Sequence, residues 1–207
     1  MLYLIGAGGH GKVILDALHL LGCEVAVLDG DPAQAGREIL GRTIAREEKV
    51  FASLEDPVDF FVGIGDGSSR RRVTERWEGR GHRLARVVHP AAITSPTADL
   101  APGVTVMAGA IVQTGAVVGK GAIINTAASV DHDCRIGAFA HIAPGTRLAG
   151  AVEVGEGAWI GIGTAVREGV VIGARTVVGA GAVVVDDLPP DVVAYGNPCR
   201  VVRQIGR

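Results

Sequence analysis

The feature that most constrains this chain is a repeat of six residues that runs without a break from Leu100 to Val184. An aliphatic residue recurs at every sixth position, and a small or short residue stands two places before each one. A helix would repeat about every 3.6 residues and an isolated strand about every two, so neither explains a fixed period of six. Such a hexad predicts a parallel β-helix, in which each repeat forms one short strand and one corner. The aliphatic positions are Leu100, Val106, Val112, Val118, Ile124, Val130, Ile136, Ile142, Leu148, Val154, Ile160, Val166, Ile172, Val178 and Val184.

The alternation within each hexad predicts which side chains form the core. Side chains two apart in a strand face the same way, so the aliphatic residue and the small one before it both face the axis. Cys134 occupies one of these small positions, and we expect it in the core. Three hexads close one triangular coil, so the repeat amounts to about five coils, stacked at about 4.8 Å. Glycine often follows the aliphatic residue, and we expect it at tight corners.

The residues before the repeat predict a βαβ unit. A buried strand over residues 2–5 leads into a loop that contains Gly6, Gly8 and Gly11, and a second strand over residues 25–28 ends at Asp29. The helix between them has four apolar positions, Val13, Leu15, Leu18 and Leu21. The glycines satisfy G-x-G-x-x-G, which is typical of dinucleotide sites. However, the segment of about 88 residues has room for only one mononucleotide half. We therefore expect the loop to hold a nucleotide diphosphate at the helix N-terminus, with NAD or a purely structural turn as alternatives.

The rest of this first domain is less regular in sequence. Glu47 and Glu48 lie in an irregular segment over residues 32–57 and are expected on the solvated surface. A third buried strand begins at Phe60, and Ser68 is the expected N-cap of a basic helix. That helix carries arginines on a face expected to be solvated, namely Arg70, Arg71, Arg72 and Arg76. His89 and Pro90 indicate a linker, which predicts a nucleotide-sugar-binding domain over 1–88 and a β-helix domain with a closing segment over 89–207.

Composition excludes several kinds of partner. The formal net charge of −2 argues against nucleic acid or an anionic membrane as the main partner. No apolar run reaches transmembrane length and Met1 leads directly into a strand, so we expect a cytoplasmic protein. The three cysteines share no close spacing, so neither a disulfide framework nor a metal site is indicated.

One hexad departs from the inert composition of the repeat. Asp131, His132 and Asp133 follow Val130, at a corner where neighbouring hexads carry glycine, alanine or threonine. An imidazole beside a carboxylate is the arrangement of a general base. The alternative is a corner salt bridge between one of these aspartates and Arg135.

A second histidine lies half a coil away. His141 is nine residues beyond His132 and occupies an outward position, so the two should lie on different sides of one prism. Side-by-side packing of three prisms would bring the His132 corner of one subunit near the His141 face of another. We therefore expect a homotrimer with intersubunit sites.

Three parts of the sequence carry a resemblance to a known family: the string Ile124–Thr126, the motif Val130–Cys134 and the glycine-rich unit in front of the repeat. In these parts the chain resembles the nucleotide-sugar N-acetyltransferases of the bacillosamine and perosamine type. The wider group includes acyltransferases encoded with sialic-acid genes. The resemblance implies a left-handed β-helix and an acetyl-CoA-dependent enzyme without a metal. It implies that His132 is the base and that Asp133 raises its basicity. It further implies acetyl-CoA contacts at His141, Gly150, Ile162 and Ala180, and nucleotide-sugar contacts at Gly8, Gly9, His10, Asp29, Gly65 and Asn125.

The implied reaction is direct transfer, in which a sugar amine loses a proton to His132 and attacks the thioester. O-acetylation of a sugar or sialic-acid hydroxyl is the main alternative, because the sequence does not separate the two acceptors. A zinc hydratase built on the same prism would need three converging histidines, whereas the repeats hold only two. A non-catalytic nucleotide-sugar-binding scaffold is the remaining alternative.

Overall fold

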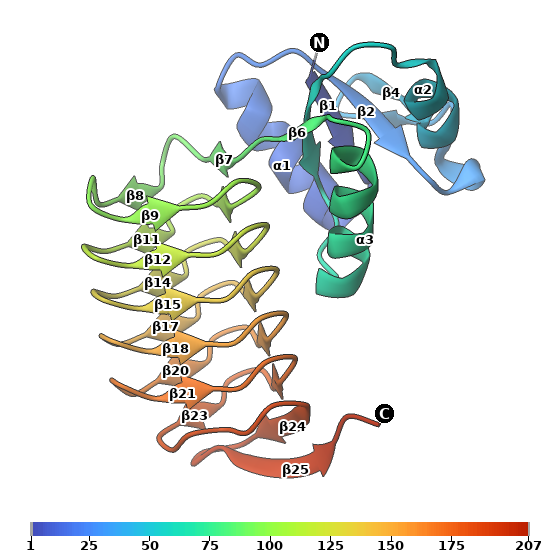
Figure 1. The fold of residues 1–207 in the computed structure, drawn as a ribbon. Coiled ribbons are helices and arrows are strands. Elements are labelled where there is room, and N and C mark those ends of the chain that lie inside the picture. The colour runs from blue at the N-terminus through green and yellow to red at the C-terminus, as the bar shows by residue number, and fades with distance from the viewer. Residues whose placement is uncertain (1, 207) are drawn as a thin grey trace. The chain divides into compact units, whose positions relative to one another are not determined.

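The computed structural model describes residues 2–206, which divide into two compact units that meet in sequence between Pro90 and Ala91 (Figure 1). The first unit is a six-stranded sheet with the order β3-β4-β2-β1-β5-β6, parallel except for the β3–β4 pair. The strands are β1 (Leu2–Ile5), β2 (Val25–Asp29), β3 (Glu38–Ile39), β4 (Arg42–Arg46), β5 (Asp59–Val62) and β6 (Arg83–Leu84). The remaining elements are α1 (Gly9–Leu20), η1 (Pro32–Gln34), α2 (Glu47–Ser53), α3 (Gly67–Glu78) and β7 (Val87–Val88).

The strand order places a crevice beside β1. The chain continues from β1 to β2 on one side and reaches β5 on the other, so the order reverses between β1 and β5. In open parallel sheets, ligands bind outside the carboxyl ends of the strands at such a reversal. The glycine loop after β1 and the Gly63–Gly65 segment after β5 both begin at this edge.

The helix over residues 9–20 confirms the predicted βαβ unit but corrects its apolar face. Its buried residues include Ile14, Leu15 and Leu18, whereas Val13 and Leu21 are exposed. Burial at positions 11, 14, 15 and 18 follows the spacing of three and four residues expected of one helical face.

Three expectations for the middle of this unit need correction, at Glu47, Ser68 and Arg70, whereas Glu48, Arg72 and Arg76 are exposed as expected. The segment 32–57 is ordered into η1, β3, β4 and α2, and Glu47 is only 4% exposed. Asp66, rather than Ser68, caps α3, because its side chain accepts the backbone N–H of Ser69 at 2.7 Å. Arg70 is buried, and its guanidinium donates to the carbonyl oxygens of Ile64 and Gly65 at 2.9 and 2.7 Å. Burial lowers the pKa of Arg70 to about 10.

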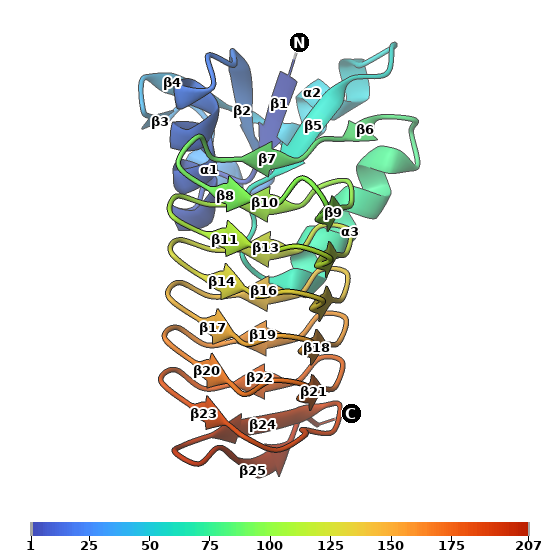
Figure 2. The ribbon, with the colours of Figure 1, turned by 90° about the vertical axis from the view of Figure 1, so that its left-hand side faces the viewer.

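The second unit is the predicted triangular coil, a left-handed parallel β-helix (Figure 2). One sheet contains β10 (Thr105–Val106), β13 (Ile123–Ile124), β16 (His141–Ile142), β19 (Trp159–Ile160), β22 (Val177–Val178), β24 (Val192–Tyr195) and the antiparallel β25 (Arg200–Gln204). The second contains β8 (Ile93–Thr94), β11 (Ile111–Val112), β14 (Ser129–Val130), β17 (Arg147–Leu148), β20 (Ala165–Val166) and β23 (Val183–Val184). The third contains β9 (Asp99–Leu100), β12 (Val117–Val118), β15 (Arg135–Ile136), β18 (Glu153–Val154) and β21 (Val171–Ile172).

The aliphatic hexad positions form the core as predicted. All of them from Val106 to Val184 are buried, as is Cys134, and only Leu100 in the first coil is partly exposed. The glycines that follow the aliphatic residues were expected to allow tight corners, and this expectation needs correction. A Cβ on Gly155 would lie 2.4 Å from the backbone nitrogen of Ala174 in the next coil, so the close stacking of coils requires this glycine. The positive φ of the corner falls two residues later, at Gly157.

No helix within residues 2–206 is both long enough and apolar enough to span a membrane.

Candidate active site

The most polar corner of the prism lies between β14 and β15 and holds His132 and Asp133. The side chain of His132 is 57% exposed, and its Nδ1 lies 2.8 Å from Oδ2 of Asp133. This hydrogen bond raises the pKa of His132 above its ordinary value, and the negative charge of Asp131 acts in the same direction. Because a carboxylate only accepts hydrogen bonds, Nδ1 carries the proton of the neutral ring and Nε2 is left to accept another. The pair therefore has the geometry of a general base.

The corner does not form the salt bridge considered as the alternative. Asp133 pairs with His132, and Asp131 accepts the backbone N–H of His132 at 2.7 Å. Within the described part of the chain, neither aspartate is paired with Arg135. Asp133 has a φ of +59°, a left-handed conformation that aspartate and asparagine adopt more readily than most residues.

Two glycines of neighbouring coils leave the space that this pair occupies. A Cβ on Gly150, in the next coil, would lie 2.5 Å from both Cε1 and Nε2 of the His132 ring. A Cβ on Gly115, in the preceding coil, would lie 2.6 Å from Oδ1 of Asp133. Gly150 is not among the residues with positive φ, so its lack of a side chain serves the His132 ring and not the backbone. The resemblance assigned Gly150 to the pantetheine and did not indicate this contact.

His141 lies on a different face of the prism, in β16, and makes a different set of contacts. Asn125 donates from Nδ2 to Nε2 of His141 at 3.0 Å, because its Oδ1 accepts the backbone N–H of Thr126. The ring of Trp159 lies on the other side, with centroids 4.8 Å apart. A ring that accepts at Nε2 is the neutral tautomer with its proton on Nδ1. His141 occupies the outward position expected of it, but its side chain is only 7% exposed.

The two remaining acetyl-CoA candidates lie on a corner beside this face. Ile162 follows β19 and Ala180 follows β22, and the backbone N–H of Gly181 donates to the carbonyl of Ile162. Both residues are exposed, Ile162 to 56%, which gives this edge an apolar strip suited to a pantetheine chain. The structure thus divides the prism residues between two edges. His132, Asp133 and Gly150 share one, and Asn125, His141, Ile162 and Ala180 lie along the other.

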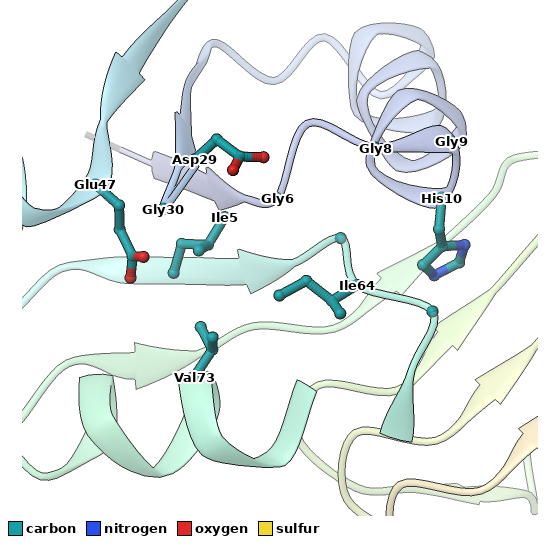
Figure 3. Close-up of a pocket in the computed structure, with 12 residues that line it drawn as sticks. Ile5, Gly6, Gly8, Gly9, His10, Asp29, Gly30, Glu47, Ile64 and Val73 are labelled. Carbon is teal, nitrogen blue, oxygen red and sulfur yellow. The ribbon is translucent and has the colours of Figure 1, made fainter. Parts of the chain in front are cut away.

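The first unit contains a cavity of about 360 Å³ at the carboxyl ends of β1 and β5. Five of the predicted nucleotide-sugar residues line it: Gly8, Gly9, His10, Asp29 and Gly65. Figure 3 shows Gly8, Gly9 and His10 at one end, Asp29 near the middle and Glu47 at the opposite end. Ile5, Ile64 and Val73 supply apolar walls between these ends. Asn125, the sixth predicted residue, belongs to the other unit and bonds to His141.

The glycines around this cavity fall into two groups. A Cβ on Gly11 would lie 1.9 Å from the carbonyl oxygen of Gly6, and a Cβ on Gly63 would lie 2.6 Å from Cα of Gly11. These positions need glycine because three backbone segments meet there. A Cβ on Gly8, Gly9 or Gly65 would meet no atom within 4 Å. These three have no positive φ, so the fold itself does not require glycine, and their lack of side chains keeps the cavity open.

Asp29 has a structural task as well as a place in the cavity. Its Oδ2 accepts the backbone N–H of Ala7 at 2.7 Å, and its Oδ1 accepts that of Asp31 at 2.8 Å. The carboxylate therefore ties the end of β2 to the glycine loop. Each carboxylate oxygen retains a further lone pair.

Sequence reasoning missed two residues that contribute to these sites. Glu47 was placed on the surface, because nothing in the segment 32–57 indicated that it begins a helix beside the cavity. Trp159 had no assigned role, although its position one coil after His141 could have suggested the ring contact. Within residues 2–206, no group of three or more histidine, cysteine or acidic side chains is placed to hold a metal ion.

Two family models match separate parts of the chain. Residues 1–77 match the family described as PglD N-terminal domain, and residues 151–186 match the bacterial transferase hexapeptide family. The acetyltransferase domain of PglB from Neisseria gonorrhoeae FA1090 is 39% identical, with a TM-score of 0.92 over 97% of this chain and 98% of that one. The same domain has been solved in complex with acetyl coenzyme A. No curated protein sequence matches the chain.

A second group of solved structures comes from Caulobacter crescentus. PerB, in complex with CoA and GDP-perosamine, is 42% identical, with a TM-score of 0.92 over 98% of this chain and 97% of that one.

A more distant solved structure, WeeI from Acinetobacter baumannii AYE, at 22% identity and a TM-score of 0.90, shares the fold. These similarities confirm the resemblance and the fold class that the sequence predicted.

Proposed function

Because this chain belongs to the family of hexapeptide-repeat sugar N-acetyltransferases that includes PglB and PerB, we propose that it acetylates the amino group of a nucleotide-linked 4-amino-deoxy sugar. The chain is an acyltransferase, and acetyl-CoA is its co-substrate. GDP-perosamine, which PerB binds, is the model for the acceptor. The observation that carries the proposal is the hydrogen bond between His132 and Asp133, because a base with a raised pKa is what an amine acceptor requires.

His132 performs the central proton transfers in this proposal. Its Nε2 removes a proton as the amine nitrogen attacks the thioester carbonyl, and the C–N bond forms. The tetrahedral intermediate then collapses, the C–S bond breaks, and the proton held by His132 is available to the departing thiolate. A positioned base contributes about 10²–10⁴-fold in rate, and orientation of the two substrates supplies much of the rest.

The cavity of the first unit is proposed to hold the nucleotide. The backbone N–H groups at the start of α1 suit a diphosphate, since the N-terminus of a helix attracts anions. The open space around Gly8, Gly9 and Gly65 supports this assignment over a purely structural turn.

We propose that the complete site forms between subunits of a cyclic trimer. One prism carries the base and Gly150 on one edge and the His141 face on another, so His141, Ile162 and Ala180 of one chain must meet His132 of a neighbour. Exposed Ile162 and Ala180 are proposed to contact the pantetheine, and His141 to lie near the thioester.

The test is a panel of nucleotide-linked amino sugars incubated with acetyl-CoA and followed by mass spectrometry. We expect one acetyl group on the sugar, stable to mild hydroxylamine, because an amide resists conditions that cleave an ester. A product that hydroxylamine cleaves would instead establish O-acetylation. Nucleotide-sugar binding without any acetyl transfer would favour the non-catalytic scaffold.

A further inference from the structure

The cavity of the first unit contains a buried carboxylate that the proposed reaction does not use. Glu47, the first residue of α2, lines the cavity at the end opposite His10 (Figure 3). Its side chain is only 5% exposed. Burial of a charged group is costly unless that group is paired, so an acidic residue at this depth calls for an explanation.

The two oxygens of this carboxylate have different surroundings. Oε1 accepts a hydrogen bond from Nε1 of Trp77 at 2.6 Å and is paired with the guanidinium of Arg76. Oε2 lies beside Gly30 on the cavity wall, 3.3 Å from where a Cβ on that glycine would be. Across residues 2–206, Oε2 accepts no hydrogen bond. One oxygen is thus fixed by α3, and the other faces the space that a ligand would fill.

The cavity between this carboxylate and the glycine loop has the layout of a nucleotide site. The loop at Gly8 and Gly9 suits the diphosphate, and Asp29 lies between the loop and Glu47 (Figure 3). The apolar side chains of Ile5 and Val73 form the walls toward Glu47, with Ile64 farther along toward His10, and these walls suit the flat faces of a base. The edge of that base would then meet Oε2.

We propose that Glu47 reads the nucleobase of the substrate and selects guanine. The inference rests on the proposed function, which places a nucleotide sugar in this cavity. A carboxylate only accepts hydrogen bonds, so it favours a base edge that only donates. Guanine presents two adjacent donors, N1–H and the N2 amino group. Adenine and cytosine pair one donor with a ring nitrogen acceptor, and uracil sets its single N3–H between two carbonyl oxygens that a carboxylate repels.

Arg76 and Trp77 fix the orientation of the Glu47 carboxylate. Their hydrogen bonds to Oε1 hold the carboxylate in place before the ligand arrives, so little ordering is required on binding. A purely structural role, in which Glu47 only joins α2 to α3, makes a different prediction. It would lower stability when Glu47 is changed but would leave the ratio of affinities for different nucleotides unaltered.

The experiment measures the dissociation constants of GDP, IDP, UDP and ADP for the full chain by calorimetry. We expect GDP to bind most tightly, and UDP and ADP to bind about tenfold to a hundredfold more weakly, as expected for lost hydrogen bonds to a charged group. IDP keeps N1–H but lacks the amino group, and should lie between them. Equal affinity for GDP and UDP, or no binding of any nucleotide, would overturn the inference.

The variant Glu47→Gln replaces the acceptor at Oε2 with an amide donor and should abolish most of the preference for GDP over UDP. Glu48→Gln is the matched control, because it removes the same charge at the next residue, whose side chain is exposed. Retention of the full GDP preference by Glu47→Gln would contradict the proposal. If this variant fails to fold in a thermal melt, the comparison of GDP, IDP and UDP with the unaltered chain still decides.

The outcome for Glu47 is separable from that of the proposed function. Acetylation of a UDP-linked amino sugar in preference to its GDP-linked counterpart would overturn guanine selection and leave the acetyltransferase proposal intact. The predicted nucleotide preference without acetylation of any amino sugar would support Glu47 as the reader of the base and would defeat the proposed function.

Discussion

Gly150 lies so close to His132 that a single methyl group on its Cα would come within 2.5 Å of ring atoms Cε1 and Nε2. The two residues occupy the same corner of successive coils, and the backbone N–H of Ala151 donates to the carbonyl of His132 at 2.8 Å. The repeat therefore places a residue without a side chain next to the nitrogen that is proposed to accept the proton. The next coil, through Gly150, thus sets the position of the His132 ring together with Asp133.

Gly150→Ala should consequently lower kcat with little loss of stability. The new methyl group meets a movable ring and not backbone, so the imidazole shifts and the fold remains. A displacement of this size is expected to reduce kcat roughly tenfold to a hundredfold. The control is the same change in a His132→Ala background, where no base remains to be displaced. A further loss of activity in that double variant would contradict the explanation.

Gly155→Ala, by contrast, should lower the stability of the fold. Its Cβ would lie 2.4 Å from a backbone nitrogen of the next coil, which cannot move without separating the coils. We expect a loss of about 1–3 kcal/mol in stability, the usual cost of overpacking. Thermal unfolding followed by circular dichroism measures it. A melting temperature unchanged from the parent chain would show that the coils accommodate the methyl group.

Asp133→Asn should change the pH dependence of the reaction. The carboxylate raises the pKa of His132, so the imidazole stays protonated, and unable to act as a base, up to a higher pH than an ordinary histidine. Asparagine tolerates the positive φ at this position and removes the charge, so the acidic limb of kcat should move to lower pH while kcat falls. Asp131→Asn is the control and should shift the limb less, because Asp131 bonds to the backbone N–H and not to the ring.

Gly8→Ala and Gly9→Ala should separate ligand binding from folding. Neither Cβ would touch the protein, so the melting temperature should stay unchanged while KM for the nucleotide sugar rises about tenfold or more. KM for acetyl-CoA should not change. Gly11→Ala is the contrasting control, because its Cβ would meet the carbonyl oxygen of Gly6 and should destabilise the unit. An unaltered KM in both Gly8→Ala and Gly9→Ala would remove the glycine loop from the binding site.

Co-expression of two inactive variants should test the shared site. If His132 of one subunit works with His141 of another, chains carrying His132→Ala and chains carrying His141→Ala will together form some intact sites. Random assembly makes about one quarter of the sites intact, so activity should reappear in the mixture. Light scattering should give a mass of three chains. An active monomer, or a mixture as inactive as its components, would contradict the intersubunit site.

The prism was predictable from the sequence to the level of single residues. A coil that stacks on itself allows only one phase, so the position of Ile142 or Val166 in the hexad determines that it faces the axis. His132 was predictable for the same reason, because a histidine two residues after the aliphatic position must lie at a corner. The period contained no information on the contact between His132 and Gly150, since it depends on side-chain direction across coils.

The first unit was less predictable because its burial depends on contacts far apart in the chain. Glu47 accepts hydrogen bonds from Trp77 and Arg76, about thirty residues away in the chain. A local sequence pattern does not predict contacts over such a separation. Arg70 appeared to belong to a solvated basic face, yet it turns inward to bond the carbonyl groups of Ile64 and Gly65. In both cases a charged residue is buried because specific partners satisfy it, and a sequence pattern does not reveal those partners.

The most direct measurement compares turnover by the parent chain and by His132→Ala, with acetyl-CoA and the amino sugar nucleotide that the parent chain prefers. Release of the CoA thiol and formation of the acetylated sugar are followed together, and acetyl-CoA binding is measured separately. We expect kcat to fall by about 10²–10⁴-fold while the affinity for acetyl-CoA is retained. A variant that turns over at the parental rate would contradict the assignment of His132 as the base.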